Sequence, residues 1–217
     1  SQIYDVWKGV SEDYQPFKIN ITTVRAVYDA APEGRRIQVV ITPTTTAAPG
    51  AGGVAYIDSF NWSGEMVCWS FYSTGKNGVE VISHEVGHTL RLVHDGRTLP
   101  AEAYYLGHTG WAPIMGAGYY QTPSQWSKGE YPNADNTEDD ISIIANDNNN
   151  VGLRADDHGA SLAAATWMEI TAAGAVSNEG VIETAADEDS FRFSTSGGAL
   201  SLNINNVAAY PNLDLMA

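Results

Sequence analysis

Three of the chain's five histidines lie within eleven residues, and a glutamate stands beside the first of them. His84 and His88 are four residues apart, so on a helix both imidazoles point from one face. Two neutral imidazole nitrogens placed in this way can bind one zinc ion, and Glu85 can act as a general base toward a water held by that ion. His94, six residues after His88, would complete the ligand set. The residue types and their spacing predict metal-assisted hydrolysis of a peptide bond.

A helix over Val79–Leu90 would position the first two histidines. Apolar residues recur every four positions in this segment, at Ile82, Val86 and Leu90. Such a stripe packs into a core, and the histidines, on another face of the helix, would face a cleft. The turn-like segment 75–78 precedes it, and Asn77 with Glu80 resembles a capping box that marks the helix start.

His94 cannot reach the same metal on an uninterrupted helix, because six residues rotate it roughly 240° from His88. The chain therefore has to leave the helix near Leu90 or Arg91 and turn back. The pattern His-Glu-x-x-His-x-x-x-x-x-His resembles the metzincin clan of zinc endopeptidases, in which a glycine makes this turn. Arg91 holds the glycine position here, and a non-glycine residue at positive φ costs roughly 1 kcal/mol. Asp95 after the third histidine is similar to the reprolysin (adamalysin-like) branch, which implies a buried structural carboxylate.

A second landmark of the resemblance lies at Trp111–Gly116, where Pro and Gly predict a tight turn. Metzincins carry a methionine turn after the third histidine, and Met115 matches it. The resemblance implies an apolar floor beneath the zinc, made by Met115. Ala117 stands where some metzincins have an additional tyrosine ligand, so none is expected at that spacing. Tyr119 is a candidate for the lining of a substrate pocket.

The resemblance extends over most of the chain. Residues 12–23 look like a helix-to-strand junction of bacterial secreted metzincin-like domains, and residues 52–57 resemble the strand that edges their cleft. The resemblance therefore implies that a peptide substrate lies along this edge, against Gly53, Val54, Ala55 and Tyr56. Residues 155–159 and 187–191 look like parts of a bacterial pre-peptidase C-terminal domain. Asp187 and Asp189 form a pair that could hold calcium, or a solvated turn.

The predicted fold class is α+β, with a metzincin-like catalytic domain over residues 1–150 and a linker with a partial β-sandwich over residues 151–217. The catalytic domain would have a twisted mixed sheet, the active-site helix and the methionine turn. A helix is predicted from about Tyr4 to Tyr14, and a polar linker at 146–150. The predicted strands lie at 19–26, 36–42, 54–57, 66–72, 180–183, 191–193 and 200–204.

Composition limits the partners and the location. The formal net charge of −15 argues against nucleic acid as a partner, and no apolar run is long enough to span a bilayer. Cys68 is the only cysteine, and its strand-like surroundings predict a buried thiol. We expect a monomeric protein of bacterial secreted type that acts on peptides or proteins, with Zn²⁺ as cofactor and Ca²⁺ as a possible second ion.

Two other functions remain open at this stage. One is a zinc hydrolase of another kind, in which Asp95 or Glu102 supplies an acidic third ligand in place of His94. The other is a secreted binding module that keeps the metal site but has no catalytic activity, because Arg91 distorts the turn.

Overall fold

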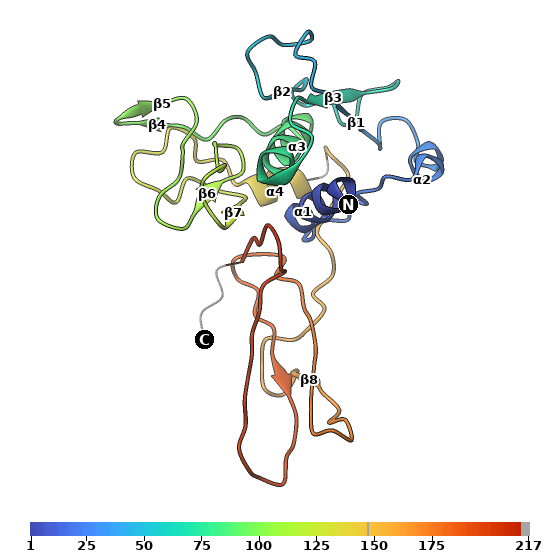
Figure 1. The fold of residues 1–217 in the computed structure, drawn as a ribbon, viewed down its shortest axis with the longest axis vertical. Helices are drawn as coiled ribbons and strands as arrows, with labels where there is room; N and C mark the ends of the chain where they lie inside the picture. The colour runs from blue at the N-terminus through green and yellow to red at the C-terminus, as the bar shows by residue number, and fades with distance from the viewer. Residues whose placement is uncertain (147, 214–217) are drawn as a thin grey trace.

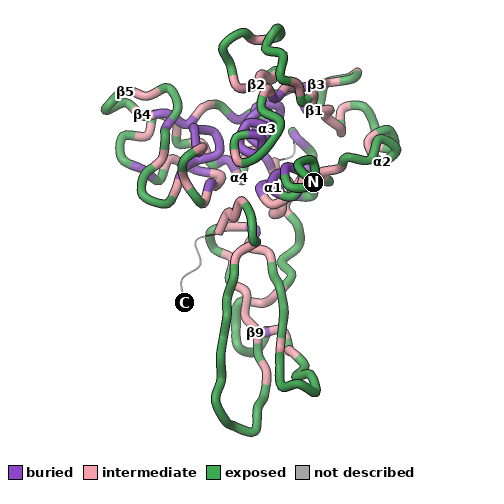
Figure 2. The backbone as a smooth tube through the Cα atoms, in the orientation of Figure 1, coloured by how far each residue is buried: buried purple, intermediate pink, exposed green. Residues whose placement is uncertain are grey.

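The computed structural model describes residues 1–146 and 148–213 (Figure 1). Asp147, in the expected linker, and residues 214–217, at the end of the expected second domain, lie outside the described residues. The first two thirds of the chain gather around helix α3, and the rest extends away as long loops (Figure 1). Buried residues concentrate around α3, whereas residues after about 151 are mostly exposed (Figure 2).

A small mixed sheet covers one side of α3 (Figure 1). It consists of β1 (Gln38–Ile41), β2 (Gly53–Val54) and β3 (Val67–Ser70), in the order β1-β3-β2. β1 runs parallel to β3, and β2 runs antiparallel to it. The β-branched and aromatic residues of β1 and β3 suit a pleated, half-buried surface. β2 lies at the edge of the sheet, next to the helix that carries the histidines.

The described helices are α1 (Gln2–Asp13), α2 (Arg25–Ala30), α3 (Gly75–Thr89) and α4 (Asp140–Ala145). Three of these four, α1, α3 and α4, contribute buried residues to the core, and α2 contributes none. α1 packs against α3, with Val6 and Val10 buried in the same cluster as Val79 and Ile82 of α3. The Tyr14 hydroxyl donates a 2.8 Å hydrogen bond to the Ser83 carbonyl and so fixes the end of α1 against α3.

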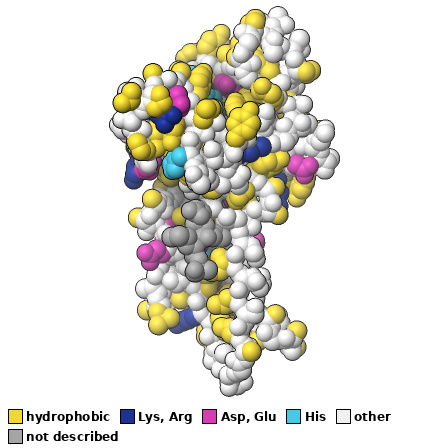
Figure 3. Space-filling view, turned by 60° about the vertical axis from the view of Figure 1, so that its left-hand side comes forward, with side chains coloured by type: hydrophobic (Ala, Val, Ile, Leu, Met, Phe, Trp, Pro, Cys, Tyr) yellow, Lys and Arg dark blue, Asp and Glu magenta, His cyan; other side chains and the backbone are white. Residues whose placement is uncertain are grey.

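Short strand pairs hold the loops that follow α3. β4 (Arg97–Thr98) pairs antiparallel with β5 (Ala101–Glu102), and β6 (Ala112–Pro113) pairs parallel with β7 (Ser124–Gln125). β8 (Thr166–Trp167) and β9 (Phe191–Arg192) form a parallel pair in the last third of the chain. The face that carries the β4–β7 loops shows mostly hydrophobic and uncharged side chains, with scattered charged ones (Figure 3). No helix in the described ranges is long and apolar enough to cross a membrane.

Several expected elements differ from the observed ones. The strand expected at 19–26 is absent, and α2 begins within it at Arg25. Helical spacing lets Arg25 pair with Asp29 at 2.8 Å, and the Arg36 guanidinium donates to carbonyls at the end of α2. The expected strands at 36–42, 54–57 and 66–72 are present in shortened form as β1, β2 and β3. Cys68 is buried, as expected.

The active-site helix begins earlier than the sequence suggests. Its N-cap is Thr74, and Asn77 lies inside the first turn, so the expected capping box is wrong. Glu80 instead accepts hydrogen bonds from Lys76, at 2.6 Å, and Ser124, at 2.5 Å. In the last third of the chain, described residues form only the β8–β9 pair, and the β-sandwich stays a prediction.

Candidate metal centre

Helix α3 presents His84 and His88 from one buried face. Every residue from Gly78 to Thr89 is buried, because the sheet and α1 pack on the apolar side of the helix and the loops after it cover the other side. The two imidazole centroids lie 4.7 Å apart, as expected for positions one helical turn apart. Both predicted histidines therefore occupy the same site.

The chain turns back directly after α3 through a Schellman motif at its C-terminus. Leu90 is the C-cap, Arg91 follows with φ 86°, and the N–H groups of Arg91 and Leu92 donate to the carbonyls of His88 and Gly87 at 2.9 and 3.1 Å. Leu92 is fully buried and anchors the turn. Arg91 therefore adopts the left-handed conformation that the sequence pattern required of it.

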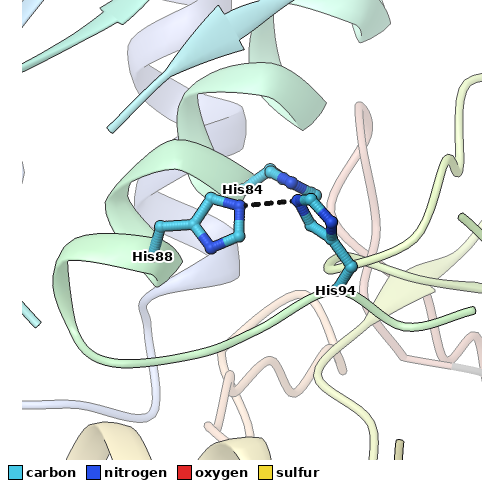
Figure 4. A group of neighbouring side chains, drawn as sticks. All are labelled: His84, His88 and His94. Carbon is cyan, nitrogen blue, oxygen red and sulfur yellow. Dashed lines mark hydrogen bonds between the residues drawn. The ribbon is translucent and has the colours of Figure 1, made fainter. Parts of the chain in front are cut away.

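His94 joins the two helical histidines after this turn (Figure 4). One ligand nitrogen from each of the three imidazoles lies within 4.8 Å of the others, and the Nε2 atoms of His88 and His94 are 2.9 Å apart. Three nitrogens 2.0–2.1 Å from one zinc ion, in tetrahedral directions, are about 3.3 Å apart. The His88–His94 separation of 2.9 Å is within a few tenths of an ångström of that spacing, and all three nitrogens lie close enough together to converge on one ion. Three imidazoles also match the donor preference of that ion.

Backbone carbonyls select the tautomers of the helical histidines. His84 Nδ1 lies 3.0 Å from the Ile114 carbonyl, and His88 Nδ1 lies 2.8 Å from the Leu92 carbonyl. A carbonyl oxygen only accepts, so each Nδ1–H donates and each Nε2 keeps its lone pair for a metal.

The electrostatics of the site favour neutral imidazoles. Burial, reinforced by the neighbouring imidazoles, lowers the pKa of His84 to about 3 and that of His94 to about 4. Burial also lowers the pKa of His88. All three rings are therefore uncharged near neutral pH, which is the form that binds metal ions.

Glu85 lies beside the histidines with its carboxylate largely buried, at 7% exposure. Burial raises its pKa to about 7, within the range suited to a general base at neutral pH. A Cβ added to Gly53 would lie 2.7 Å from Glu85 Oε1 and 2.6 Å from the Trp69 carbonyl. Gly53 thus lets the edge strand approach the carboxylate directly.

Met115 lies beneath α3, fully buried. A Cβ on Gly87 would lie 2.7 Å from the Met115 sulfur, so glycine at that position permits the contact. The backbone around Met115 is joined to the site twice. The Ile114 carbonyl accepts from His84, and the Asp95 N–H donates to the Met115 carbonyl at 2.9 Å. Ala112 and Pro113, expected in a turn, form β6, and the turn follows at 114–116.

The residues predicted to bind substrate lie near the metal centre, and those predicted to bind calcium lie far from it in the sequence. Val54 and Ala55 are half-buried beyond Gly53, and Tyr56 is exposed. Burial raises the pKa of Tyr119 to about 12, and its hydroxyl would be 3.6 Å from a Cβ at Gly52. Asp187 and Asp189 lie in the last third of the chain. There each offers a carboxylate oxygen within 4.8 Å of one from Asp156.

Neither acidic alternative to His94 joins the two helical histidines in the described part of the chain. Asp95 is buried and accepts a 3.3 Å hydrogen bond from Asn136. Glu102 accepts from Arg97 at 2.6 Å. Sequence reasoning missed Tyr104, whose ring centroid lies 4.3 Å from that of His94. It also missed the Ile114 and Leu92 carbonyls. No sequence pattern identifies the Tyr104 ring or these two carbonyl groups, because each reaches the site through the packing of loops.

Among known proteins, one family model matches part of the chain. Residues 6–95 match the family model described as metallo-peptidase family M12B, reprolysin-like. The matched segment ends one residue after His94 and contains Glu85 and all three histidines. Comparisons with curated proteins and with solved structures gave no significant match. The family match supports a metallopeptidase of the metzincin type, and peptidases of that family use zinc.

Proposed function

We propose that this chain is a zinc-dependent endopeptidase of the metzincin type. The observation that carries the proposal is the convergence of three neutral imidazoles, two of them on the helix that also carries the buried Glu85. His84, His88 and His94 would hold the ion, and a fourth position would remain for water or substrate. Bound zinc supplies a Lewis acid that polarises the scissile carbonyl and lowers the pKa of a coordinated water toward about 7.

Glu85 is the general base of this mechanism. It accepts a proton from the attacking water and then donates that proton to the leaving amine. Its burial disfavours the charged form, so the carboxylate takes up a proton more readily than an exposed glutamate does. Gly53 lies directly against the Glu85 side chain on the sheet side.

The substrate binds along the free edge of β2. This strand is bonded on one side to β3, so in the sheet its other edge is available for main-chain hydrogen bonds. An extended peptide added there would pass beside Glu85, because Gly53 is in van der Waals range of that side chain. Val54, Ala55 and Tyr56 would continue the contact, and Tyr119 would line the side-chain pocket.

Met115 would form the apolar floor of the site. Its buried sulfur packs against Gly87 and leaves no room for water at that point. An apolar floor supports the orientation of the ligands and lowers the local dielectric without touching the metal. Ala117 offers no side-chain ligand, and we propose His84, His88 and His94 as the protein ligands.

A quenched-fluorescence peptide with both termini blocked tests endopeptidase activity on the zinc-loaded chain. We expect cleavage that 1,10-phenanthroline abolishes and zinc restores. Glu85→Gln is the matched variant, because it keeps the shape of the side chain and removes its basicity. It should retain one zinc per chain and lose roughly 10²–10⁴-fold in kcat. Full activity of Glu85→Gln, or no cleavage by a chain carrying one zinc, would contradict the proposal.

Zinc stoichiometry and peptide cleavage also distinguish the proposed function from the two alternative functions. If Asp95 or Glu102 were the third ligand, His94→Ala would keep full zinc stoichiometry. We expect it to lose zinc, because His94 is the group that lies against His88. A zinc-loaded wild-type chain that cleaves no peptide would instead favour a binding module.

A second ion, calcium, is proposed for the C-terminal region, which we place outside the cell together with the catalytic unit. Asp156, Asp187 and Asp189 offer oxygens within 4.8 Å of one another, a spread that matches Ca–O distances of about 2.4 Å. One oxygen of the nearby buried Glu183 has no hydrogen-bond partner.

Calcium, but not magnesium, should raise the Tm of the protein. Asp189→Asn should remove this shift and the exposed control Glu188→Gln should keep it. No calcium-specific shift would refute the site.

A further inference from the structure

The three histidines of the metal centre are not held equally. His84 and His88 each donate an Nδ1 hydrogen bond to a backbone carbonyl, at 3.0 and 2.8 Å. In the described ranges His94 has no such bond, and its one hydrogen bond joins its Nε2 to His88 Nε2 at 2.9 Å. His94 is also the most exposed of the three rings. Some other contact must therefore fix the plane of its imidazole.

Tyr104 supplies that contact. Its ring centroid lies 4.3 Å from the centroid of His94, with an angle of 42° between the planes. The same ring lies 6.1 Å from His84. Aromatic pairs at such distances attract each other and restrict ring rotation. Tyr104 is 44% exposed, so it covers the outer side of the metal centre rather than filling the core.

The position of Tyr104 is set by its neighbour in the chain. The Tyr105 N–H donates to the Asp95 carbonyl at 2.7 Å, and the Ala117 N–H donates to the Tyr105 carbonyl at 2.9 Å. Tyr105 is buried and stacks on Tyr131 at 4.1 Å. The loop between β5 and β6 is therefore fixed to the residue that follows His94. Tyr104 and His94 are held in register by backbone hydrogen bonds.

We infer that Tyr104 is the positioning residue for His94: its ring replaces the carbonyl hydrogen bond that fixes each of the other two histidines. This inference rests on the proposed zinc site and adds a residue to it. Tyr104 acts through the orientation of His94 and not by binding the metal. The contact with His94 is made by the ring of Tyr104, so the hydroxyl should not be needed for this role.

Zinc affinity, measured by competition with a chromophoric chelator on the full chain, tests the inference. Tyr104→Ala should raise the zinc dissociation constant about tenfold, as for the loss of other groups that orient metal ligands. Tyr104→Phe keeps the ring and should stay within about twofold of wild type. Tyr120→Ala is the matched control, because Tyr120 is 87% exposed. The Tm of the metal-free Tyr104→Ala protein should stay within about 2 °C, as expected for a substitution outside the core.

The possible failures are distinguishable. A wild-type chain that binds no zinc would refute the proposed function, and this inference with it. Tight zinc binding by wild type and by Tyr104→Ala alike would overturn only the role of Tyr104. A Tyr104→Phe protein as weakened as Tyr104→Ala would assign the effect to the hydroxyl and would also overturn the ring-packing explanation. If Tyr104→Ala is unstable without metal, Tyr104→Leu keeps the bulk but not the flat face and should still bind zinc more weakly than Tyr104→Phe.

Discussion

Replacing Arg91 with glycine should stabilise the protein. Arg91 follows the C-cap of α3 with φ 86°, where a Cβ atom crowds the backbone. Removing the strain of a non-glycine residue in the left-handed conformation should raise the free energy of unfolding by roughly 1–2 kcal/mol. The greater freedom of glycine in the unfolded chain removes roughly 0.5–1 kcal/mol of that gain. The midpoints of these two ranges give a net rise of roughly 0.8 kcal/mol in the free energy of unfolding. The Arg91 side chain is exposed, so its loss should cost little.

Urea unfolding of the metal-free protein measures this difference without a contribution from zinc binding. Arg91→Ala is the control, because alanine keeps the Cβ atom and loses the rest of the side chain. The unfolding free energy of Arg91→Gly should exceed that of both Arg91→Ala and wild type, with an unchanged m value. Equal stability of Arg91→Gly and Arg91→Ala would refute the reasoning. Zinc affinity should change little, because the turn is already formed with arginine in place.

Three further substitutions test the packing and charge of the site. Gly87→Ala would place a Cβ 2.7 Å from the buried Met115 sulfur. It should lower the unfolding free energy by roughly 1–3 kcal/mol, although alanine is the better helix former; unchanged stability in urea would contradict the contact. Gly53→Ala should displace Glu85 and reduce kcat/KM at least about tenfold with one zinc retained, and wild-type activity would show that the strand lies further away. Burial, and to a smaller extent the charge of Asp95, raises the pKa of Asp140 to about 9. The folded state then holds a proton that the unfolded state has lost between about pH 4 and 9, so the unfolding free energy falls as pH rises through that range. Between pH 5 and 8, the free energy of unfolding of Asp140→Asn should fall less than that of wild type. Equal slopes of unfolding free energy against pH for the two proteins would contradict the raised pKa of Asp140.

The sequence predicted the parts of the site that depend on local periodicity. The spacing of His84 and His88 places both on one helical face, and the need for a turn at Arg91 follows from the rotation per residue. The structure agrees at both points. The turn expected at Trp111–Gly116 was only partly correct, because Ala112 and Pro113 form β6 and the turn begins at Ile114.

What the sequence could not predict depends on contacts between distant segments. Tyr104 reaches His94 only because Tyr105 bonds to the Asp95 backbone, and no spacing rule expresses that bond. Asn77 had the features of a cap, yet the N-cap is Thr74 and the helix begins at Gly75. Three acidic residues, Glu138, Asp139 and Asp140, precede or begin α4, and the one that caps it is Asp139, which accepts from the Ser142 N–H. The Glu138 carboxylate accepts from the Val93 N–H, 45 residues away, and so stabilises the turn to His94.

X-ray absorption at the zinc edge of the loaded wild-type chain tests the central claim most directly. The three-histidine site predicts three imidazole nitrogens at about 2.0–2.1 Å, with one further oxygen ligand. A spectrum fitted by two imidazoles and a carboxylate, or a chain that takes up no zinc, would contradict the assignment of His84, His88 and His94 as a single metal centre.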